Sequence, residues 1–85
     1  MSCCKGCDTE NLDTKSQDLF RARQSLIEEL EAIDLYEERI QETGDPELKI
    51  ILMHNQNEER EHAAMLIEYL RKRDAEFDKK FKNHD

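Results

Sequence analysis

A three-residue interruption, Gly44-Asp45-Pro46, divides most of this 85-residue chain into two long segments with helical periodicity. Gly44 suits the position just after a helix, Asp45 suits an N-cap, and proline is tolerated in the first turn of a helix. A helix over about residues 14–43 is therefore followed by a second helix over about 46–73. So short a connection predicts that the two helices fold back as an antiparallel hairpin.

The hairpin domain is expected to occupy residues 14–82, of which 75–82 form either a short third helix or a frayed end, with 83–85 as a tail. Residues 1–13 are predicted to be a disordered leader, which contains Cys3, Cys4 and Cys7. Cys4 and Cys7 have a CxxC spacing, but no second pair or nearby histidine completes a zinc site. An odd number of cysteines also argues against a disulfide framework.

Composition narrows the class of protein further. The chain is 40% charged, with no tryptophan, two glycines and one proline, which suits an all-α fold with solvated helix faces. A net charge of -8 argues against nucleic-acid binding, which needs a clustered basic surface. The sequence has no apolar run of about 18 residues that would span a membrane. Its N-terminus does not resemble a signal peptide, so we expect a cytoplasmic protein.

Each predicted helix carries one apolar stripe when side chains are placed at 100° per residue. The first stripe contains Leu19, Ala22, Leu26, Leu30, Ile33, Tyr36 and Ile40, and the second contains Leu48, Ile51, Leu52, Ala63, Leu66, Tyr69 and Leu70. Glu29 lies inside the first stripe, Glu59 lies near the centre of the second, and His62 lies toward its edge. A carboxylate in a helix interface is costly unless it is paired or bound to a cation.

These three polar residues together predict a metal site. Glu59 and His62 form a Glu-x-x-His step and are neighbours on one helix surface, and the hairpin should bring Glu29 close to them. Any one of the three alone is more often a packing residue, but the combination has the spacing of ligands. Mixed carboxylate and imidazole ligands suit iron, manganese or zinc.

The predicted site is only half of a known arrangement. A carboxylate-bridged di-iron bundle takes a Glu from each of two helices and a Glu-x-x-His from each of two others. This chain supplies one of each, so two copies related by a twofold axis would supply all six ligands. The arithmetic predicts a homo-oligomer built from dimers that share the metal site, and a four-helix bundle core that one short chain cannot form alone.

Three stretches then resemble a known family, the encapsulated ferritins: IEELEAIDLY at 27–36, DPEL at 45–48 and HNQNEEREHAAM at 54–65. The resemblance covers about residues 17–75. It implies a two-helix half-ferritin that dimerises into a ferritin-like four-helix bundle and assembles into a ring-shaped decamer. It also implies a di-iron ferroxidase site between subunits and housing inside an encapsulin shell.

The resemblance implies roles for individual residues. Glu29, Glu59 and His62 match the iron ligands, with Glu59 as the bridge, and Tyr36 matches the tyrosine beside the centre. The remaining matches are Glu28 and Glu31, on the metal's access route, and His54, at secondary metal contacts, where a plain surface role is equally consistent. Leu35 departs from the family by replacing a tryptophan. The shell-targeting C-terminal extension is also missing after 83–85, so we expect a truncated sequence, an unencapsulated protein or another means of attachment.

The expected function is therefore a ferroxidase that oxidises Fe(II) to Fe(III) with two irons per dimer, for which zinc, manganese or calcium can substitute. The product would feed mineralisation or storage inside an encapsulin nanocompartment. One alternative is a structural or adaptor hairpin, in which Glu59 and His62 form a polar layer that sets pairing specificity. Another is a metal sensor or chaperone that uses the cysteine-containing leader.

Overall fold

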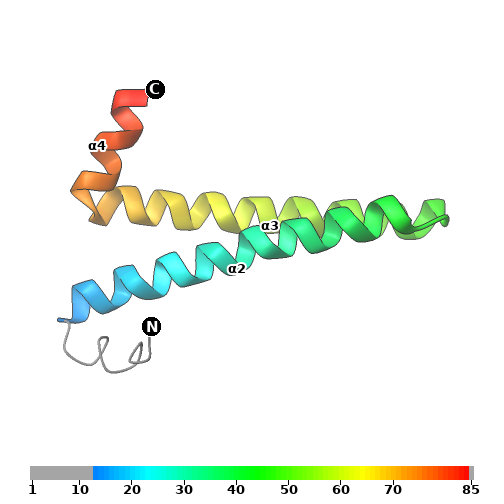
Figure 1. The fold of residues 1–85 in the computed structure, drawn as a ribbon, viewed down its shortest axis with the longest axis horizontal. Helices are drawn as coiled ribbons and strands as arrows, with labels where there is room; N and C mark the ends of the chain where they lie inside the picture. Colours follow the sequence, from blue (N-terminus) through cyan, green and yellow to red (C-terminus); the bar gives the residue numbers. More distant parts are fainter. Residues whose placement is uncertain (1–12, 85) are drawn as a thin grey trace.

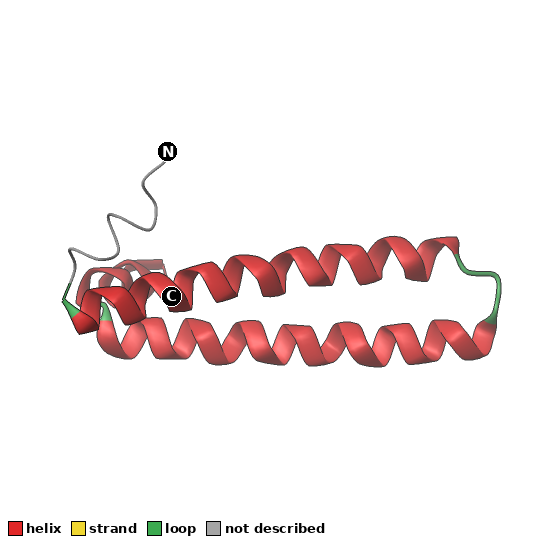
Figure 2. Ribbon diagram, turned by 90° about the horizontal axis from the view of Figure 1, so that it is seen from below, coloured by secondary structure: helices red, strands yellow, loops and turns green. Residues whose placement is uncertain are grey.

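The computed structural model describes residues 13–84, which form the helices α2 (Thr14–Glu42), α3 (Pro46–Arg73) and α4 (Ala75–His84). Helices α2 and α3 lie antiparallel and side by side, and α4 leaves the end of α3 at a steep angle (Figures 1 and 2). The predicted all-α hairpin is confirmed, and α4 continues to His84, beyond the predicted limit at residue 82. The predicted cysteine leader lies outside the described residues, except for Asp13.

The turn between α2 and α3 is built by the residues that interrupt the sequence. Thr43 is the C-cap of α2, and its Oγ1 accepts a hydrogen bond from the N–H of Asp45 at 3.1 Å. The Asp45 carboxylate then accepts from the backbone N–H groups of the second and third residues of α3, at 2.9 and 3.4 Å. Pro46 occupies the first helical position, where its missing N–H costs nothing. Asp13 caps α2 in the same way.

The elbow between α3 and α4 depends on Asp74, which serves both helices. Its N–H donates to the carbonyl of Leu70 at 2.8 Å, and its Oδ1 accepts from the N–H of Phe77 at 3.1 Å. Arg71 Nε donates to Asp78 Oδ1 at 2.7 Å across the bend. This pair fixes the direction in which α4 leaves the hairpin.

The apolar core is a thin seam between α2 and α3, and the hairpin covers less of each stripe than the sequence predicts. The buried apolar residues are Ala22, Ile40, Leu52, Ala63 and Leu70. Leu30, Leu48 and Ile51 of the predicted stripes remain 50%, 43% and 50% exposed. Two cylinders touch along a line, whereas each stripe spans about a third of a helix circumference, so its edges stay uncovered. Substantial apolar surface is left on the hairpin.

One polar side chain of the described residues is buried in the seam: Gln56, which is 4% exposed. Its Nε2 donates hydrogen bonds to the carbonyl oxygen of Ile33 at 3.1 Å and to Glu37 Oε1 at 3.0 Å, both on α2. The other oxygen of Glu37 accepts from Gln41 Nε2 at 2.8 Å. These two amide donors hold the pKa of Glu37 below its ordinary value, with Gln56 as the larger cause. We refer to Ile33, Glu37 and Gln56 as the amide layer.

Candidate metal centre

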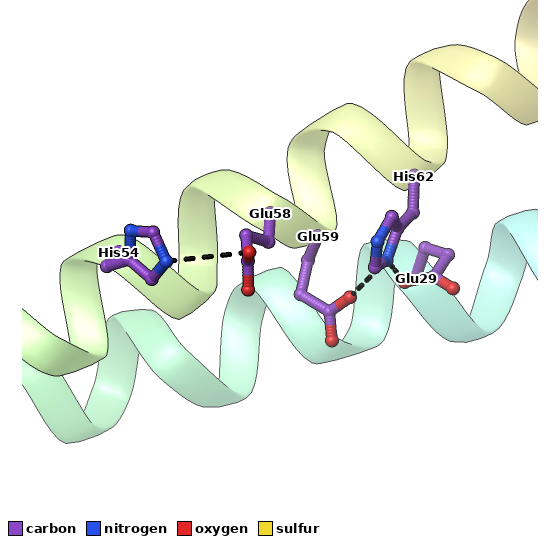
Figure 3. A network of polar contacts seen from close by, with 5 residues as sticks. All are labelled: Glu29, His54, Glu58, Glu59 and His62. Carbon is purple, nitrogen blue, oxygen red and sulfur yellow. Dashed lines mark hydrogen bonds and ion pairs between the residues drawn. The ribbon is translucent and has the colours of Figure 1, made fainter.

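The structure brings together the three residues whose spacing predicts a metal site. Glu29 comes from the middle of α2, and Glu59 and His62 come from adjacent turns of α3 (Figure 3). His62 Nδ1 lies 3.0 Å from Glu59 Oε1 and 3.5 Å from Glu29 Oε1. One potential ligand atom of each residue lies within 4.8 Å of the other two. We refer to these residues as the triad.

The triad lies at the edge of the seam rather than inside it. The side chains of Glu29 and Glu59 are 26% and 23% exposed, whereas that of His62 is 51% exposed. The two carboxylates therefore come from the apolar seam, and the imidazole closes the group on the solvent side. A cation could reach this group without the helices separating.

The electrostatics of the triad show crowding of negative charge. The pKa of Glu29 is raised, first by its hydrogen bond with Glu59, then by partial burial and by the Glu59 charge, while His62 partly offsets these effects. The pKa of His62 is also raised, chiefly by its hydrogen bond with Glu59 and further by the charge of Glu29. Both shifts favour the protonated forms of Glu29 and His62, since a proton reduces the excess of negative charge.

The donor set fits a divalent metal ion. Two carboxylates and one imidazole are the oxygen and nitrogen ligands that iron, manganese and zinc accept. Three side chains of one hairpin leave coordination positions open for ligands from elsewhere. Metal binding would also replace the repulsion between Glu29 and Glu59 with attraction to a common cation.

An open groove of about 560 Å³ continues from the triad toward the end of α2 that begins at Thr14. Both helices line it: Asp18, Arg21, Ala22, Ser25 and Glu29 from α2, and His62, Met65, Leu66 and Tyr69 from α3. Met65 is 60% exposed there. The exposed side of the triad therefore borders a largely apolar surface.

Tyr36 does not join the triad through any hydrogen bond or ring contact of its own. It lies seven residues after Glu29 on α2, about 10 Å along the helix axis, and the guanidinium of Arg39 sits 5.6 Å from its ring centroid. Its predicted position on the apolar stripe agrees with its partial burial. The role implied by the resemblance stays a prediction.

The other predicted metal-contact residues lie on exposed helix faces. Glu28 and Glu31 are exposed on α2. His54 Nε2 lies 3.4 Å from Glu58 Oε2, and the side chains of both are more than half exposed (Figure 3). Within residues 13–84, none of Glu28, Glu31 and His54 gathers with two further acidic, cysteine or histidine residues at ligand spacing.

Sequence reasoning missed Gln56, although a signal was present. Gln56 follows Leu52 by four residues and precedes Ala63 by seven, which places its side chain on the apolar stripe. A glutamine at such a position predicts an interhelical hydrogen bond, because a buried amide needs partners.

Comparison with known proteins agrees with this architecture. The sequence matches the EncFtn-like family over residues 6–84. A solved structure, protein ne0167 from Nitrosomonas europaea, superposes with a TM-score of 0.83 at 52% sequence identity, covering 88% of this chain and 82% of that one. The helical hairpin and its ferritin-like fold are thus shared with an experimentally determined relative.

Curated relatives point in the same direction. The encapsulated ferritin-like protein of Rhodospirillum rubrum is 48% identical over 68 residues, which are 80% of this chain and 49% of that protein. The ferritin-like protein of Thermotoga maritima is 49% identical over 61 residues, 72% of this chain and 54% of that one. The encapsulin nanocompartment cargo protein EncC of Myxococcus xanthus is 43% identical over 54 residues, 64% of this chain and 42% of that one.

Fold and site together define an all-α hairpin of the ferritin-like class with a candidate metal-binding triad. The chain belongs to the encapsulated ferritin-like family. It spans about half the length of the curated relatives that it matches. Among the described residues, no helix is both long enough and apolar enough to cross a bilayer.

Proposed function

We propose that this protein is a ferroxidase, which oxidises Fe(II) to Fe(III) at a two-iron centre shared by two copies of the chain. The observation that carries the proposal is the convergence of Glu29, Glu59 and His62 within 4.8 Å, from two helices, at the exposed edge of the seam. Family membership supports iron as the metal, because relatives of this chain are described as ferritin-like.

The need for a second copy follows from the incompleteness of one hairpin. A two-iron bundle site takes four carboxylates and two histidines from four helices, and this hairpin contributes half of each. The groove beside His62 and the exposed Met65 offer apolar surface on the same side as the open coordination positions. A twofold partner packed there would complete both the bundle core and the ligand set.

The chemistry assigns a simple task to each group. Two Fe(II) ions are the substrates: each would lose one electron, and the two electrons together with two protons from water would reduce one dioxygen to hydrogen peroxide. Glu29 and Glu59 supply negative charge that stabilises the higher charge of Fe(III) more than that of Fe(II). Glu59 faces both His62 and Glu29, so it is the residue suited to bridge two ions. The half-exposed imidazole of His62 would supply the nitrogen ligand on the solvent side of the centre.

Aerobic Fe(II) oxidation by single variants tests this function. Glu29→Ala and His62→Ala should each reduce the initial rate of Fe(III) formation to that of Fe(II) in buffer, because each removes a ligand from both halves of the shared centre. The measurement is the absorbance of Fe(III) after mixing the anaerobically purified protein with Fe(II) and then air.

Glu38→Ala is a matched control, since Glu38 is also a glutamate of α2 but is exposed and lies outside the triad. It should oxidise Fe(II) at the wild-type rate. A Glu29→Ala or His62→Ala variant that keeps the wild-type rate would remove the assignment.

The adaptor hypothesis gives Glu59 and His62 a purely structural role as a buried polar layer. Among the described residues, the buried polar side chain is Gln56, whose amide nitrogen donates two hydrogen bonds, whereas the side chain of His62 is 51% exposed. An adaptor should also purify and assemble identically with and without a chelator. The ferroxidase proposal expects the two preparations to differ.

The same proposal extends to the surroundings of the protein. Its relative from Myxococcus xanthus is described as a cargo protein of an encapsulin nanocompartment. We expect this protein likewise to act inside a shell, where Fe(III) released from the ring can mineralise. The carboxylates Glu28 and Glu31 and the exposed His54 are proposed to guide or hold metal on its way to the triad.

A further inference from the structure

In the amide layer, a side chain of one helix is hydrogen-bonded to the backbone of the other. Gln56 of α3 uses one hydrogen of its amide for the carbonyl of Ile33 and the other for Glu37, both on α2. At 4% exposure the Gln56 side chain has little access to water that could replace these partners. Leaving such a group unbonded costs about 1–3 kcal/mol.

The apolar contacts cannot set the alignment of α2 and α3 as sharply. The seam contains five buried apolar residues, and Ala22 and Ala63 are too small to interlock with neighbours. Apolar attraction is also non-directional, so it tolerates sliding of one helix along the other. A hydrogen bond to a fixed backbone carbonyl does not tolerate such sliding, because a displacement of about 1 Å takes the donor out of hydrogen-bonding range.

The triad requires this alignment. Glu29 lies one turn before Ile33 on α2, and Glu59 lies about one turn after Gln56 on the antiparallel α3, so the two layers are neighbours along the hairpin. A slip of one helical turn, about 5.4 Å, would carry Glu29 beyond the 4.8 Å within which the ligand atoms now lie. The two facing carboxylates favour such a displacement whenever no cation holds them together.

We propose that Gln56 is a positioning residue, which fixes the register of α3 on α2 and thereby presents Glu59 and His62 to Glu29 at metal-binding distance. The proposal rests on the metal site of the proposed function, but it concerns a residue that binds no metal itself. The turn at Thr43–Pro46 ties the helices at one end, and the amide layer ties them beside the triad.

The test is Co(II) binding to the metal-free protein, measured by calorimetry and by the visible absorption of bound Co(II), which reports coordination geometry. Gln56→Met keeps the length and bulk of the side chain but removes both interhelical hydrogen bonds. We expect helical circular dichroism to be retained, the Co(II) affinity to fall about tenfold or more, and the visible spectrum to change. A variant that merely lost some stability would bind Co(II) with the wild-type spectrum.

Two variants control for the removed interaction. Gln41→Met deletes another amide donor to Glu37, but Gln41 and Glu37 both belong to α2, so the link between helices is kept and binding should be unchanged. Glu37→Gln retains an acceptor for Gln56 and should also bind Co(II) as the wild type does. A loss of affinity in Glu37→Gln as large as in Gln56→Met would contradict the proposal, since charge rather than the bond would then matter.

If Gln56→Met loses its helical structure, Gln56→Asn decides instead, because its amide is one methylene shorter and cannot reach the Ile33 carbonyl and Glu37 without a shift of α3 on α2. Weaker Co(II) binding or a changed spectrum in Gln56→Asn supports the role of Gln56, and wild-type affinity and spectrum overturn it. Wild-type affinity and spectrum in a folded Gln56→Met variant would overturn the proposal and leave the metal site intact. A wild-type protein that binds no Co(II) would instead remove the metal site, and the role of Gln56 with it.

Discussion

The amide layer and the triad are neighbouring polar layers on the same apolar seam, but they differ in charge, in exposure to solvent and in hydrogen bonding. In the amide layer, a neutral donor is 4% exposed and both of its hydrogens are bonded within the chain. In the triad, two carboxylates face each other, and the imidazole that joins them is 51% exposed. In the amide layer, both amide hydrogens of Gln56 have acceptors on α2, whereas the triad holds acceptor atoms close together that a cation could share.

This difference separates structural from functional polarity in a helix interface. A polar group whose hydrogen bonds are complete contributes alignment and needs nothing further. A cluster of like charges held at short distance costs free energy in the empty state, and under the proposed function a bound cation compensates this cost. The contrast supports the two different roles proposed for the polar interruptions of this stripe.

The largest effect that would distinguish the layers is the response of assembly to metal. Fe(II), or Zn(II) or Ca(II) as substitutes, should shift the population toward higher oligomers, since the cation neutralises the four glutamates that two copies bring together. At a free metal concentration of 100 times Kd the bound state gains about 2.7 kcal/mol. Native mass spectrometry across an Fe(II) titration gives the subunit number and the metals per dimer together.

The Glu29→Ala variant provides the comparison, because it keeps the amide layer and removes the crowded charge. Its oligomer distribution should be insensitive to metal. Wild-type protein that shows one mass with and without metal would contradict the proposed origin of assembly.

A smaller effect tests whether the amide layer acts through alignment or through overall stability. Asp45→Ala removes the N-cap of α3 without touching either layer, and it should cost about 1 kcal/mol in the free energy of unfolding. Denaturant unfolding measures this cost. The Co(II) affinity of Asp45→Ala should remain that of the wild type. An affinity that falls together with stability would show that any loss of stability weakens metal binding, and would contradict a specific role of Gln56 in alignment.

The smallest effect is the pH dependence of stability in the metal-free protein, because the groups involved are partly or largely exposed and screened. Glu29 and His62 have raised pKa values in the folded state, so their stabilising contributions are complete below the ordinary values of 4.5 and 6.5 and are lost as pH rises through the folded values. Glu37 has a lowered pKa, so its contribution is present above 4.5 and is lost as pH falls through the folded value.

The two layers should therefore respond to pH in opposite directions. Thermal unfolding measures this response. It should be followed in steps of about one pH unit from about pH 3 to about pH 9, which brackets the ordinary pKa values of these groups. The Glu29→Gln/His62→Gln variant should lose less stability than the wild type as pH rises. The Glu37→Gln variant should lose less as pH falls, and parallel curves for all three proteins would refute the assignment.

Most of the fold could be predicted from local sequence. The turn at Gly44-Asp45-Pro46 and the 3.6-residue periodicity are short-range signals, and they fixed both long helices to within a residue or two. The end of the last helix differs from the prediction by two residues, because a short helix gives fewer periodic positions from which to place its end. Exposure of Leu30 and Ile51 was not predicted, because it depends on how narrow the contact between two cylinders is.

The triad could be predicted because its members interrupt an apolar stripe with charge, which has a high cost that sequence alone reveals. Gln56 interrupts the same stripe with a neutral amide, whose burial costs less than that of a charge and therefore gives a weaker signal. Its partner is the backbone carbonyl of Ile33, which every residue type possesses and which no residue pattern marks. Interactions with main-chain atoms of this kind become visible only in three dimensions.

The amide layer also has a consequence for how such proteins diversify. If Gln56 and the turn at Thr43–Pro46 together set the alignment, as proposed, neighbouring aliphatic positions can change in size and shape without displacing the ligands. A different set of metal ligands could be introduced one helical turn away from Gln56 while the amide layer is left unchanged. The alignment of the two helices and the identity of the ligands could then be changed independently of each other.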